Sequence, residues 1–497
     1  MSADPTNTKL EDWPLRRLAR VVIEFTTPFH VGAGRGGAGI DALVVTDANG
    51  LPAIPGSSLA GALRAATSPA LRNSLFGYQD RNKGLGSRLT VSWACIHDST
   101  NTPVEGVTGE SRRADPILVN ALAPRLRDHV RLHHQGAQDA EQHGKFDEWP
   151  VCAGHRFTFE LELVSQNSPT EVAAWGQLLG LLRAGSLRLG GKTRRGFGGC
   201  KIVALRADCL DLATPEGFAG YLARPVSLAG PLPPPQLEPA GSPPPAVGLT
   251  ATVTLTPVGY WMFGGGDDPE GAARTGKAPV RDDRIVWNKE GGKVQRDVLV
   301  LPGSAIKGAL AHRVAWHGNR ANPANWIDAT KGALAGDADA WRRARKATAA
   351  AGEDNPAVKE LFGFQKSKTD GRRGRVVIDD VFVTATEQCD QLAPHVAIDR
   401  VTGGAIDNRL FMDRPLWQAP NALVITLTIL GTASDSISAA ARAALLAALD
   451  DVCHGRLALG AGGGRGMGYF TGEVAWNDGG RWAGETSATP LGKEAVP

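Results

Sequence analysis

Alternation of apolar and polar residues predicts the main strands of this chain. The runs RLARVVIEF at 17–25 and LTATVTLT at 249–256 each open one half of the sequence, and the second alternates almost perfectly. The runs HRFTFELEL and ALVITLTIL show the same alternation later in each half. Because successive strand residues point to opposite faces of a sheet, each run predicts a strand with one buried face.

Helices are predicted between these strands at matching places. Each half contains a proline-glycine-serine segment, IPGSSLAGALRAAT at 54–67 and LPGSAIKGALAHRVAWH at 301–317, whose serine could cap the first helical amides. The small residues there would let backbone or a ligand approach the helix closely. A second helix is predicted from PTEVAAWGQLLGLLRAG in the first half and from SDSISAAARAALLAALDD in the second.

The two halves repeat one another block by block, and this duplication is the most informative feature of the sequence. Each half runs strand, helix, strands, helix, strand, which is the order of a ferredoxin-like βαββαβ core. We therefore predict an α+β protein of two tandem modules with insertions. The other matching blocks are HVGAG at 30–34 and MFGGG at 262–266, LFGY at 75–78 and LFGF at 361–364, residues 131–151 and 397–417, and the closing segments LGGKTRRGFGGCKI at 189–202 and LGAGGGRGMGYF at 459–470.

A proline-rich stretch, RPVSLAGPLPPPQLEPAGSPPPAVG at 224–248, separates the two halves. Proline has no amide N–H to donate and favours extended backbone, so the stretch predicts a semi-rigid linker. The alternative is an ordered loop packed on one domain. The expected organisation is a first module at 1–224, a linker at 225–248 and a second module at 249–497.

The overall charge neither requires nor excludes a nucleic-acid partner. The chain has 54 Lys and Arg against 51 Asp and Glu, a formal net charge of +3, which permits a local basic patch offset by acidic surface elsewhere. Its six cysteines include no CxxC pair, which favours reduced cysteines over a zinc ribbon. No secretory signal and no run long enough to cross a bilayer is visible, and we expect a cytoplasmic protein without a membrane partner.

Cations stand among glycines in both closing segments. Lys192, Arg194 and Arg195 occupy the first segment, and Arg465 occupies the second. Glycines expose backbone N–H groups and the cations add positive charge, so these segments could cradle phosphates. A structural glycine turn is the alternative, although its recurrence argues for binding. The run GAGRGG at 32–37 is either a flexible loop or an RNA-backbone contact, since a strand rather than a helix follows it.

Asp41 is the sharpest catalytic candidate, because it lies among apolar residues directly after a glycine-rich segment. An aspartate beside RNA could bind a divalent metal or help to activate a ribose 2′-hydroxyl. Aligning IDALVV with DDRIVW places Asp283 opposite Asp41, and Asp282 is an alternative because the second loop is longer. Turn capping is the default role for a lone aspartate.

Taken together, these blocks resemble the RAMP superfamily of CRISPR-associated proteins. The resemblance is carried by HVGAG, GIDALVVTDANGLPAIPGSSLAGALRAA and the closing loop in the first half. In the second half it is carried by FGGG, DDRIVW, VLVLPGSAIKGALAHRV, AIDRVTGGAIDNRLF and the second closing loop. The pattern is most similar to the backbone subunit of type III complexes, and the fusion of two modules resembles the type III-D branch.

This resemblance implies RRM-like modules that stack along a guide crRNA, with a protruding hairpin to which residues 131–151 and 397–417 contribute. It implies cleavage of complementary target RNA with a divalent metal, Mg²⁺ or Mn²⁺, at Asp41 and less securely at Asp283. It also implies large, small and further RAMP subunits of a type III complex as partners. The residues expected to contact RNA are His30, Gly32, Gly34, Arg35, Ser57, Ser58, Arg64, Lys192, Arg194, Arg195, Ser304, Lys307, Arg313, Arg400 and Arg465.

Two other functions stay open from the sequence. The first is a non-catalytic scaffold that binds guide RNA, in which the aspartates are only structural. The second is a processing endoribonuclease that cuts the guide precursor. Such enzymes often use histidine, and His30 precedes the first glycine loop, but the second half has no histidine at the matching place.

Overall fold

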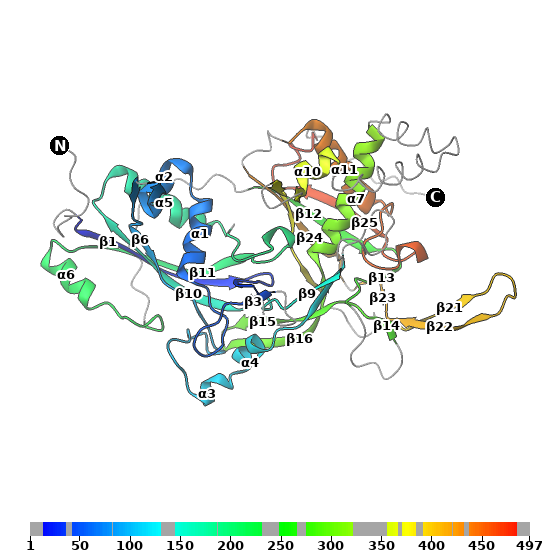
Figure 1. Ribbon diagram of the computed structural model, residues 1–497, viewed down its shortest axis with the longest axis horizontal. Coiled ribbons are helices and arrows are strands. Elements are labelled where there is room, and N and C mark those ends of the chain that lie inside the picture. Colours follow the sequence, from blue (N-terminus) through cyan, green and yellow to red (C-terminus); the bar gives the residue numbers. More distant parts are fainter. Residues whose placement is uncertain are drawn as a thin grey trace.

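The computed structural model describes residues 13–35, 42–81, 83–130, 145–185, 187–230, 248–265, 275–321, 355–365, 370–383, 391–419, 421–431 and 437–484. Two α+β modules lie side by side along the long axis of the molecule, the first at the left of Figure 1 and the second at the right. Each module has its own sheet and its own hydrophobic core.

The first module is built on an antiparallel sheet with the strand order β11-β1-β10-β6. Helices lie on one side of this sheet (Figure 1). The chain order β1, α1, β6, β10, α5, β11 is that of a ferredoxin-like core. The bounds are β1 Leu15–Phe25, α1 Gly56–Ala66, α2 Pro69–Phe76, β6 Leu89–Val91, β7 Cys95–Ile96, β10 Arg156–Ser165, α5 Pro169–Arg183, β11 Cys200–Asp211 and α6 Pro215–Leu222.

The second module repeats this topology. Its sheet has the order β19-β24-β12-β25, and the chain order is β12, α7, β19, β24, α11, β25. Numbering the four core strands of each module in chain order, both sheets have the order fourth, first, third, second. The predicted pair of βαββαβ modules is confirmed. The bounds are β12 Gly248–Pro257, α7 Gly303–Ala321, α10 Pro356–Leu361, β19 Val376–Ile378, β24 Leu423–Leu430, α11 Ala439–Cys453 and β25 Phe470–Trp476.

Alternating burial along the strands places one face of each sheet in its core. On β24, Leu423, Ile425, Leu427 and Ile429 are buried, and the residues between them are less so. The same period holds over the second half of β10, where Phe159, Leu161 and Leu163 join the core of the first module. Full burial of one such side chain stabilises the fold by about 1.5–3 kcal/mol. The alternation read from the sequence therefore marks real core faces.

The two core helices of the first module, α1 and α5, begin differently. α5 begins with a capping box, in which Ser168 Oγ accepts from Glu171 N and Glu171 Oε2 accepts from Ser168 N. α1 begins after Pro55 without a side-chain cap, and Ser57 and Ser58 are exposed in its first turn. The predicted serine cap of α1 is wrong, because backbone hydrogen bonds alone start this helix.

The small residue required at the start of α1 and α7 is glycine. A Cβ atom on Gly56 would lie 2.1 Å from the carbonyl oxygen of Val91, and one on Gly303 would lie 2.1 Å from that of Ile378. In each module the next core strand in the chain, β6 or β19, therefore runs against the first turn of the helix. The sequence left open whether backbone or a ligand approaches this helix closely, and in the structure it is backbone.

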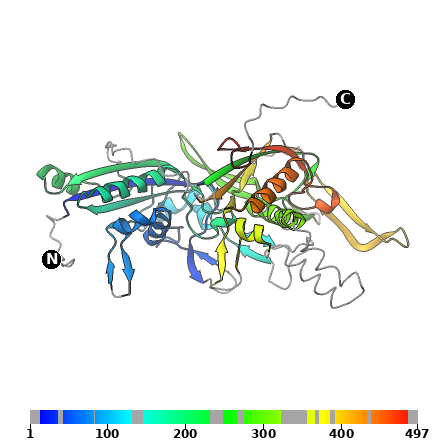
Figure 2. The same ribbon diagram turned by 90° about the horizontal axis from the view of Figure 1, so that it is seen from above.

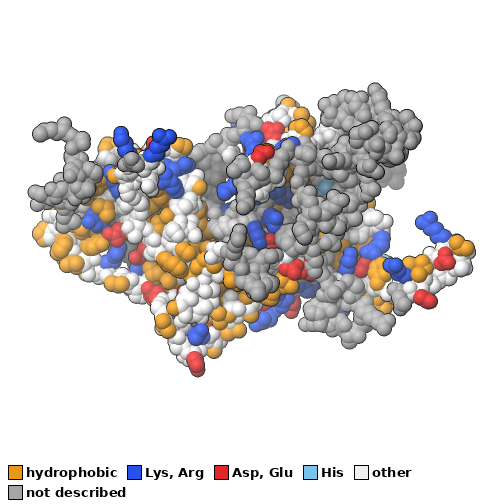
Figure 3. All heavy atoms as spheres, viewed as in Figure 1, with side chains coloured by type: hydrophobic (Ala, Val, Ile, Leu, Met, Phe, Trp, Pro, Cys, Tyr) orange, Lys and Arg blue, Asp and Glu red, His pale blue; other side chains and the backbone are white. Residues whose placement is uncertain are grey.

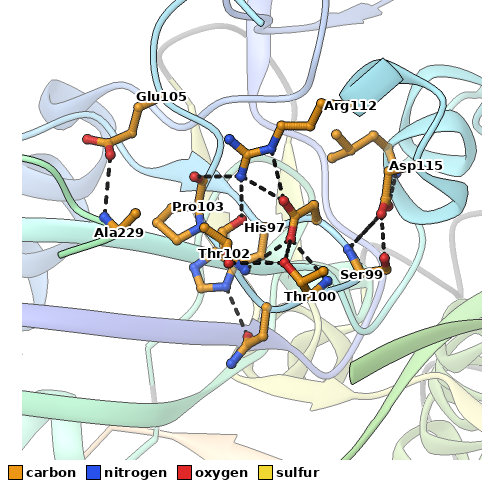
Figure 4. Close-up of polar contacts among 12 residues, drawn as sticks. His97, Ser99, Thr100, Thr102, Pro103, Glu105, Arg112, Asp115 and Ala229 are labelled. Carbon is orange, nitrogen blue, oxygen red and sulfur yellow. Dashed lines mark hydrogen bonds and ion pairs between the residues drawn. The ribbon is translucent and has the colours of Figure 1, made fainter. Parts of the chain in front are cut away.

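The first residues of the predicted linker are held against the first module. Glu105 accepts hydrogen bonds from Ser227 Oγ and from the backbone amide of Leu228. It also accepts from the backbone amide of Ala229 (Figure 4). Arg20 donates to the carbonyl oxygens of Leu228 and Gly230. This part of the linker is an ordered loop on the first module, while residues 231–247 lie outside the described residues. The predicted module boundaries stay predictions.

A polar network shapes the loop that follows β7. Asp98 Oδ2 accepts from Arg112 Nε at 2.9 Å, and Asp115 accepts from Ser99 N and caps α4 (Pro116–Leu122) (Figure 4). The short helix α3 (Glu110–Arg113) supplies the arginine. These contacts fix the carbonyl oxygen of Ser99, which receives a hydrogen bond from the second module.

A long hairpin of the second module packs on the first. It consists of β15 (Arg281–Asn288) and β16 (Gly291–Leu301), which pairs in turn with β20 (Val381–Val383). Ile285 N donates to Ala153 O at 2.8 Å, and Gly292 N donates to Ser99 O at 2.8 Å. Ile285 also shares a small core with Ile117 and Cys152. The two modules are therefore joined by backbone pairing as well as by side chains.

Further hairpins project from the two modules. The hairpin of β21 (Ala393–Ile398) and β22 (Ala405–Asp413) extends far from the second module (Figure 1). Its counterpart in the first module is the hairpin of β8 (Arg127–Val130) and β9 (Lys145–Glu148). The other short strands are β2 Gly32–Arg35, β3 Ala42–Val44, β4 Tyr78–Asp80, β5 Lys83–Leu85, β13 Tyr260–Trp261, β14 Thr275–Lys277, β17 Gly363–Gln365, β18 Gly371–Arg373 and β23 Leu416–Trp417.

Candidate nucleic-acid interface

A glycine-rich turn closes the first module. Its centre is a 3-10 turn at Thr193–Arg195. Leu189 N donates to Gly198 O at 2.9 Å across the turn, and Gly191 N donates to His30 O at 2.7 Å. The turn is thereby tied to the residue at which the first glycine-rich segment begins.

The turn that closes the second module has the same geometry. Its centre is a 3-10 turn at Gly463–Arg465. Leu459 N donates to Gly468 O at 2.8 Å, and Ala461 N donates to Met262 O at 2.7 Å. The repeat read in the sequence is therefore also a repeat in three dimensions.

One glycine in each turn has no substitute. Gly190 has φ +87° and Gly460 has φ +86°, a left-handed conformation that other residues rarely adopt. A Cβ atom on Gly190 would also lie 2.4 Å from His30 O, and one on Gly460 would lie 2.3 Å from Met262 O. These glycines and their neighbouring amides serve the shape of the turn, so the turn offers a ligand mainly its cations.

A buried carboxylate lies beneath the first turn. Glu148, the last residue of β9, is 4% exposed and accepts from Lys192 Nζ at 2.6 Å and from Arg195 at 3.1 Å. His129 on β8 places its Nε2 3.5 Å from the same carboxylate. Burial lowers the pKa of His129, and the opposite effect of the Glu148 charge is smaller. Turn and hairpin are thus fastened together by charge.

The second turn is fastened in the same way. Asp413, the last residue of β22, is 1% exposed and is ion-paired with Arg465. His395 on β21 places its Nε2 3.5 Å from Asp413 and stacks on Phe411. Arginine, carboxylate and histidine therefore recur as a unit, at equivalent places of both modules.

We expect Asp413→Asn to loosen the base of the projecting hairpin. The change keeps the shape of the side chain but removes a charge-assisted hydrogen bond, which contributes about 1.5–3 kcal/mol. Amide hydrogen exchange in residues 405–413 should then become about 10- to 100-fold faster, since 1.4 kcal/mol corresponds to a factor of ten. Asp399→Asn is the control, because Asp399 lies in the exposed turn and bonds only within it. Equal effects of the two changes would contradict this role of Asp413.

An arginine from the first module is buried between two aspartates of the second. Arg127 on β8 is 6% exposed, contacts Asp282 Oδ2 through Nη2 at 2.5 Å, and is also ion-paired with Asp380. Burial alone would lower the pKa of Arg127, but Asp380 and Asp282 raise it above its usual value. Asp380 also accepts from Gly303 N, so the pair reaches the start of α7.

Asp283 lies in the same junction. It is 3% exposed and accepts from Asn120 Nδ2 at 2.8 Å, while Arg125 and Arg296 lie at 3.1 and 3.4 Å. Asp282 is equally buried, and burial raises its pKa. The two carboxylates offered by the sequence for catalysis in the second half are therefore enclosed and partnered by groups of both modules. Their catalytic role stays a prediction, and this placement disfavours it.

Backbone hydrogen bonds give the alignment of the two halves near these aspartates. Val45 N donates to Val31 O, and Val280 N donates to Phe263 O, both at 2.8 Å. Val45 O then accepts from Ala53 N and Val280 O from Val300 N, each donor lying three residues before the first residue of α1 or α7. Val45 and Val280 are therefore equivalent.

This register corrects the alignment made from the sequence. Asp41 precedes Val45, whereas Asp282 and Asp283 follow Val280, so Asp283 is not opposite Asp41. The β15–β16 hairpin takes the place in the second module that the short turn at 46–52 has in the first. Its apolar run resembles the segment after Asp41, which explains the misalignment. Asp41 itself and residues 266–274 lie outside the described residues.

The sequence matches the model of the RAMP superfamily twice, over residues 22–201 and 254–471. This chain belongs to the RAMP superfamily. Each match covers one of the two modules, so the chain is a tandem of RAMP modules. No curated protein matches it. RAMP membership points to a CRISPR-associated subunit that binds RNA and acts in complexes with RNA and other subunits.

Several residues predicted to contact RNA lie on the surface of the RAMP modules. Arg400 lies in the exposed turn of the β21–β22 hairpin, and Arg195 is exposed on the first closing turn. Gly32 and Gly34 on β2 and Ser57 and Ser58 on α1 are exposed as well. The side chain of Arg35 lies outside the described residues. RNA contact by these residues stays a prediction.

The other predicted RNA contacts are engaged within the protein. His30 is 5% exposed, and Arg313 is ion-paired with Asp451 at 2.5 Å. Lys307 donates to Arg194 O at 2.6 Å, and burial, with Arg194 and Arg195 nearby, lowers the pKa of Lys307 to about 8. The half-buried residues in this group are Ser304, Lys307, Lys192 and Arg194. Lys307 thereby joins α7 to the first closing turn.

The metal expected from the resemblance finds no ready site in the described part of the chain. No group of three or more His, Cys, Asp or Glu side chains there is placed to hold a metal ion. Asp283 is already engaged by Asn120 and Arg125, and Asp41 is not described. We therefore derive no step through a metal. Among the same residues, no helix has both the length and the apolar character needed to cross a membrane.

Sequence reasoning missed the residues that hold this interface together. Arg127 gives no local signal, because its partners come from the other RAMP module. Glu148 and Asp413 do carry a signal: each is the central residue of an aromatic-x-acid-x-Pro pattern, FDEWP at 146–150 and FMDRP at 411–415. This pattern lies within the third repeated block and could have identified the two carboxylates as a pair.

Proposed function

We propose that this chain is a backbone subunit of a type III CRISPR ribonucleoprotein, which binds guide crRNA and cleaves complementary target RNA. The observation that carries the proposal is the duplicated unit of closing turn and hairpin. In both RAMP modules a surface arginine, Arg195 or Arg465, is oriented by a buried carboxylate at the hairpin base. Two equivalent cationic units suit a ligand that repeats along its length, as a ribose-phosphate chain does.

In this proposal, sequence specificity belongs to base pairing between guide and target. The protein then needs only shape and backbone contacts, for which a small net charge suffices. The proposed partners are guide crRNA, target RNA and the large, small and further RAMP subunits of a type III complex. A cytoplasmic location and the type III-D assignment belong to the same proposal.

Cleavage is proposed for the first module, at Asp41, with Mg²⁺ or Mn²⁺ as the cofactor. The resemblance of GIDALVVTDANGLPAIPGSSL to the active type III backbone subunits supports this part. The second module is favoured as a scaffold that binds without cleaving, since Asp282 and Asp283 are buried in the module junction. The whole chain as a non-catalytic scaffold is the alternative that this same burial favours.

The test is to purify the complex from its native cells and to sequence the RNA that accompanies it. We expect short RNAs of uniform length that share the repeat-derived end of a CRISPR array. The loaded complex should then cut a labelled target complementary to the guide and leave a scrambled target intact. Random cellular RNA in the preparation, or equal cutting of both targets, would overturn the proposal.

A further inference from the structure

An open groove of about 530 Å³ lies between α1 and the β4–β5 hairpin, away from the closing turns. Its walls carry three cations, Arg64, Arg81 and Lys83, together with the aromatic ring of Tyr78. Gly84 and Gly86 also line the groove and carry no side chain, so backbone is accessible beside the cations. Figure 3 shows Lys and Arg side chains on this part of the first module, near α1 and α2.

The positive charge of this groove is not balanced by the described residues around it. Arg64 donates only to the neutral carbonyl oxygens of Phe76 and Gly77. Arg81 and Lys83 are exposed and form no ion pair with a described residue, and neither does Asp80, the carboxylate of the same hairpin. With Asp80 included, the groove keeps a net positive charge and donors that face solvent.

Tyr78 gives the groove a second chemical character. Its side chain is 44% exposed, so the ring is accessible to a ligand in the groove. Cations beside an exposed aromatic ring are the combination with which proteins hold single-stranded nucleic acid, since the phosphates contact the cations and a base stacks on the ring.

The same arrangement recurs in the second module. The β17–β18 hairpin occupies the equivalent place after α10, and Phe364 stands where Tyr78 stands. Phe364 pairs across the hairpin with Arg372, and Lys359 lies 5.6 Å from its ring. Figure 2 shows both hairpins, β4–β5 in blue and β17–β18 in yellow, projecting from the same side of the molecule.

We propose that the β4–β5 groove is a binding site for a nucleotide of single-stranded RNA, with a base on Tyr78 and its phosphates on Arg64, Arg81 and Lys83, and that the β17–β18 hairpin provides an equivalent contact in the second module. This site rests on the proposed RNA-binding function but is separate from the closing turns and the β21–β22 hairpin. It gives the chain a second row of RNA contacts, one for each module.

The test measures the binding of the full chain to a fluorescein-labelled, unstructured 40-nucleotide RNA by anisotropy at several salt concentrations. Each phosphate contact on a single strand contributes about 0.7 to the slope of log affinity against log salt, so Arg81→Ala with Lys83→Ala should reduce the slope by about 1.4. Tyr78→Ala should weaken binding about 5- to 100-fold and leave the salt slope unchanged, because stacking releases no counterions. The matched control is Lys201→Ala with Arg206→Ala, which removes the same charge from exposed positions on β11.

The outcomes separate this site from the general function. If the unchanged chain does not bind the RNA, the proposed function and this inference both fail. If it binds and both groove variants behave like the β11 control, the groove is not an RNA site although the proposed function stands. Circular dichroism of every variant shows whether a loss reflects misfolding, and Tyr78→Phe, which keeps the stacking face, should then restore binding.

Discussion

Replacing Arg127 with alanine is expected to weaken the junction between the two RAMP modules by about 3–5 kcal/mol. The side chain is 6% exposed and is the shared partner of Asp282 and Asp380. Removing it leaves two carboxylates in a buried site without their cation, and this desolvated charge, more than the lost contact, is the source of the effect. The module cores should remain folded, because Arg127 belongs to neither of them.

Hydrogen exchange measures this change where it acts. The amides of Ile285 and Gly292 bond across the junction, so their exchange should become at least about 100-fold faster, since 1.4 kcal/mol is a factor of ten. The amides of β10, inside the first sheet, should change little. Arg125→Ala is the control, because this 36% exposed arginine also reaches across the junction, to Asp283 and Asp297, but should contribute about 0–1 kcal/mol. Similar effects of the two variants would show that burial of Arg127 is unimportant.

The fold could be predicted well from the sequence because its information is local. The alternating runs of β12 and β24 and the repeated order of blocks indicated two βαββαβ modules, and the sheets have that topology. The closing turns were also predicted as a pair, because each needs glycine at a left-handed position, Gly190 or Gly460. Periodicity and turn chemistry act over a few residues, and a single sequence records them.

The site was predicted less well because it depends on contacts between modules. The β15–β16 hairpin carries an apolar run similar to that after Asp41, and the true register is given by backbone hydrogen bonds such as that from Val280 to Phe263. Arg127 gains its importance from Asp282 and Asp380, which are far away in the sequence. No pattern within one module could have placed these three residues together.

Among the described residues, the positions equivalent to Arg127 and Asp380 do not repeat the chemistry of this junction. The contacts of Gly56 and Gly303 make β6 and β19 equivalent, so the counterpart of Asp380 is Trp93, which is 52% exposed. The pairings of His129 with Phe146 and of His395 with Phe411 make Ala393 the counterpart of Arg127. The pairing of Arg127 with Asp282 and Asp380 therefore has no counterpart at these matching positions, and the duplicated modules differ where they meet each other.

Asp41→Ala is expected to lower the rate of target cleavage by the guide-loaded complex about 10²- to 10⁴-fold, the usual contribution of a positioned acid or base. Affinity for the target should not change, because removal of an interaction made only in the transition state lowers the rate and not the binding. The measurement is single-turnover cleavage of a labelled complementary RNA, with binding followed separately at equilibrium.

Asp283→Asn distinguishes the two modules in this assay. The amide can still accept from Asn120, and Asp283 is buried in the junction, so we expect the cleavage rate to stay within about twofold of the unchanged complex, as for a residue outside the reacting centre. Loss of cleavage with Asp283→Asn but not with Asp41→Ala would reverse the assignment and would require the junction to open. If neither change affects cleavage while RNA binding persists, the chain is a scaffold and another subunit cuts the target.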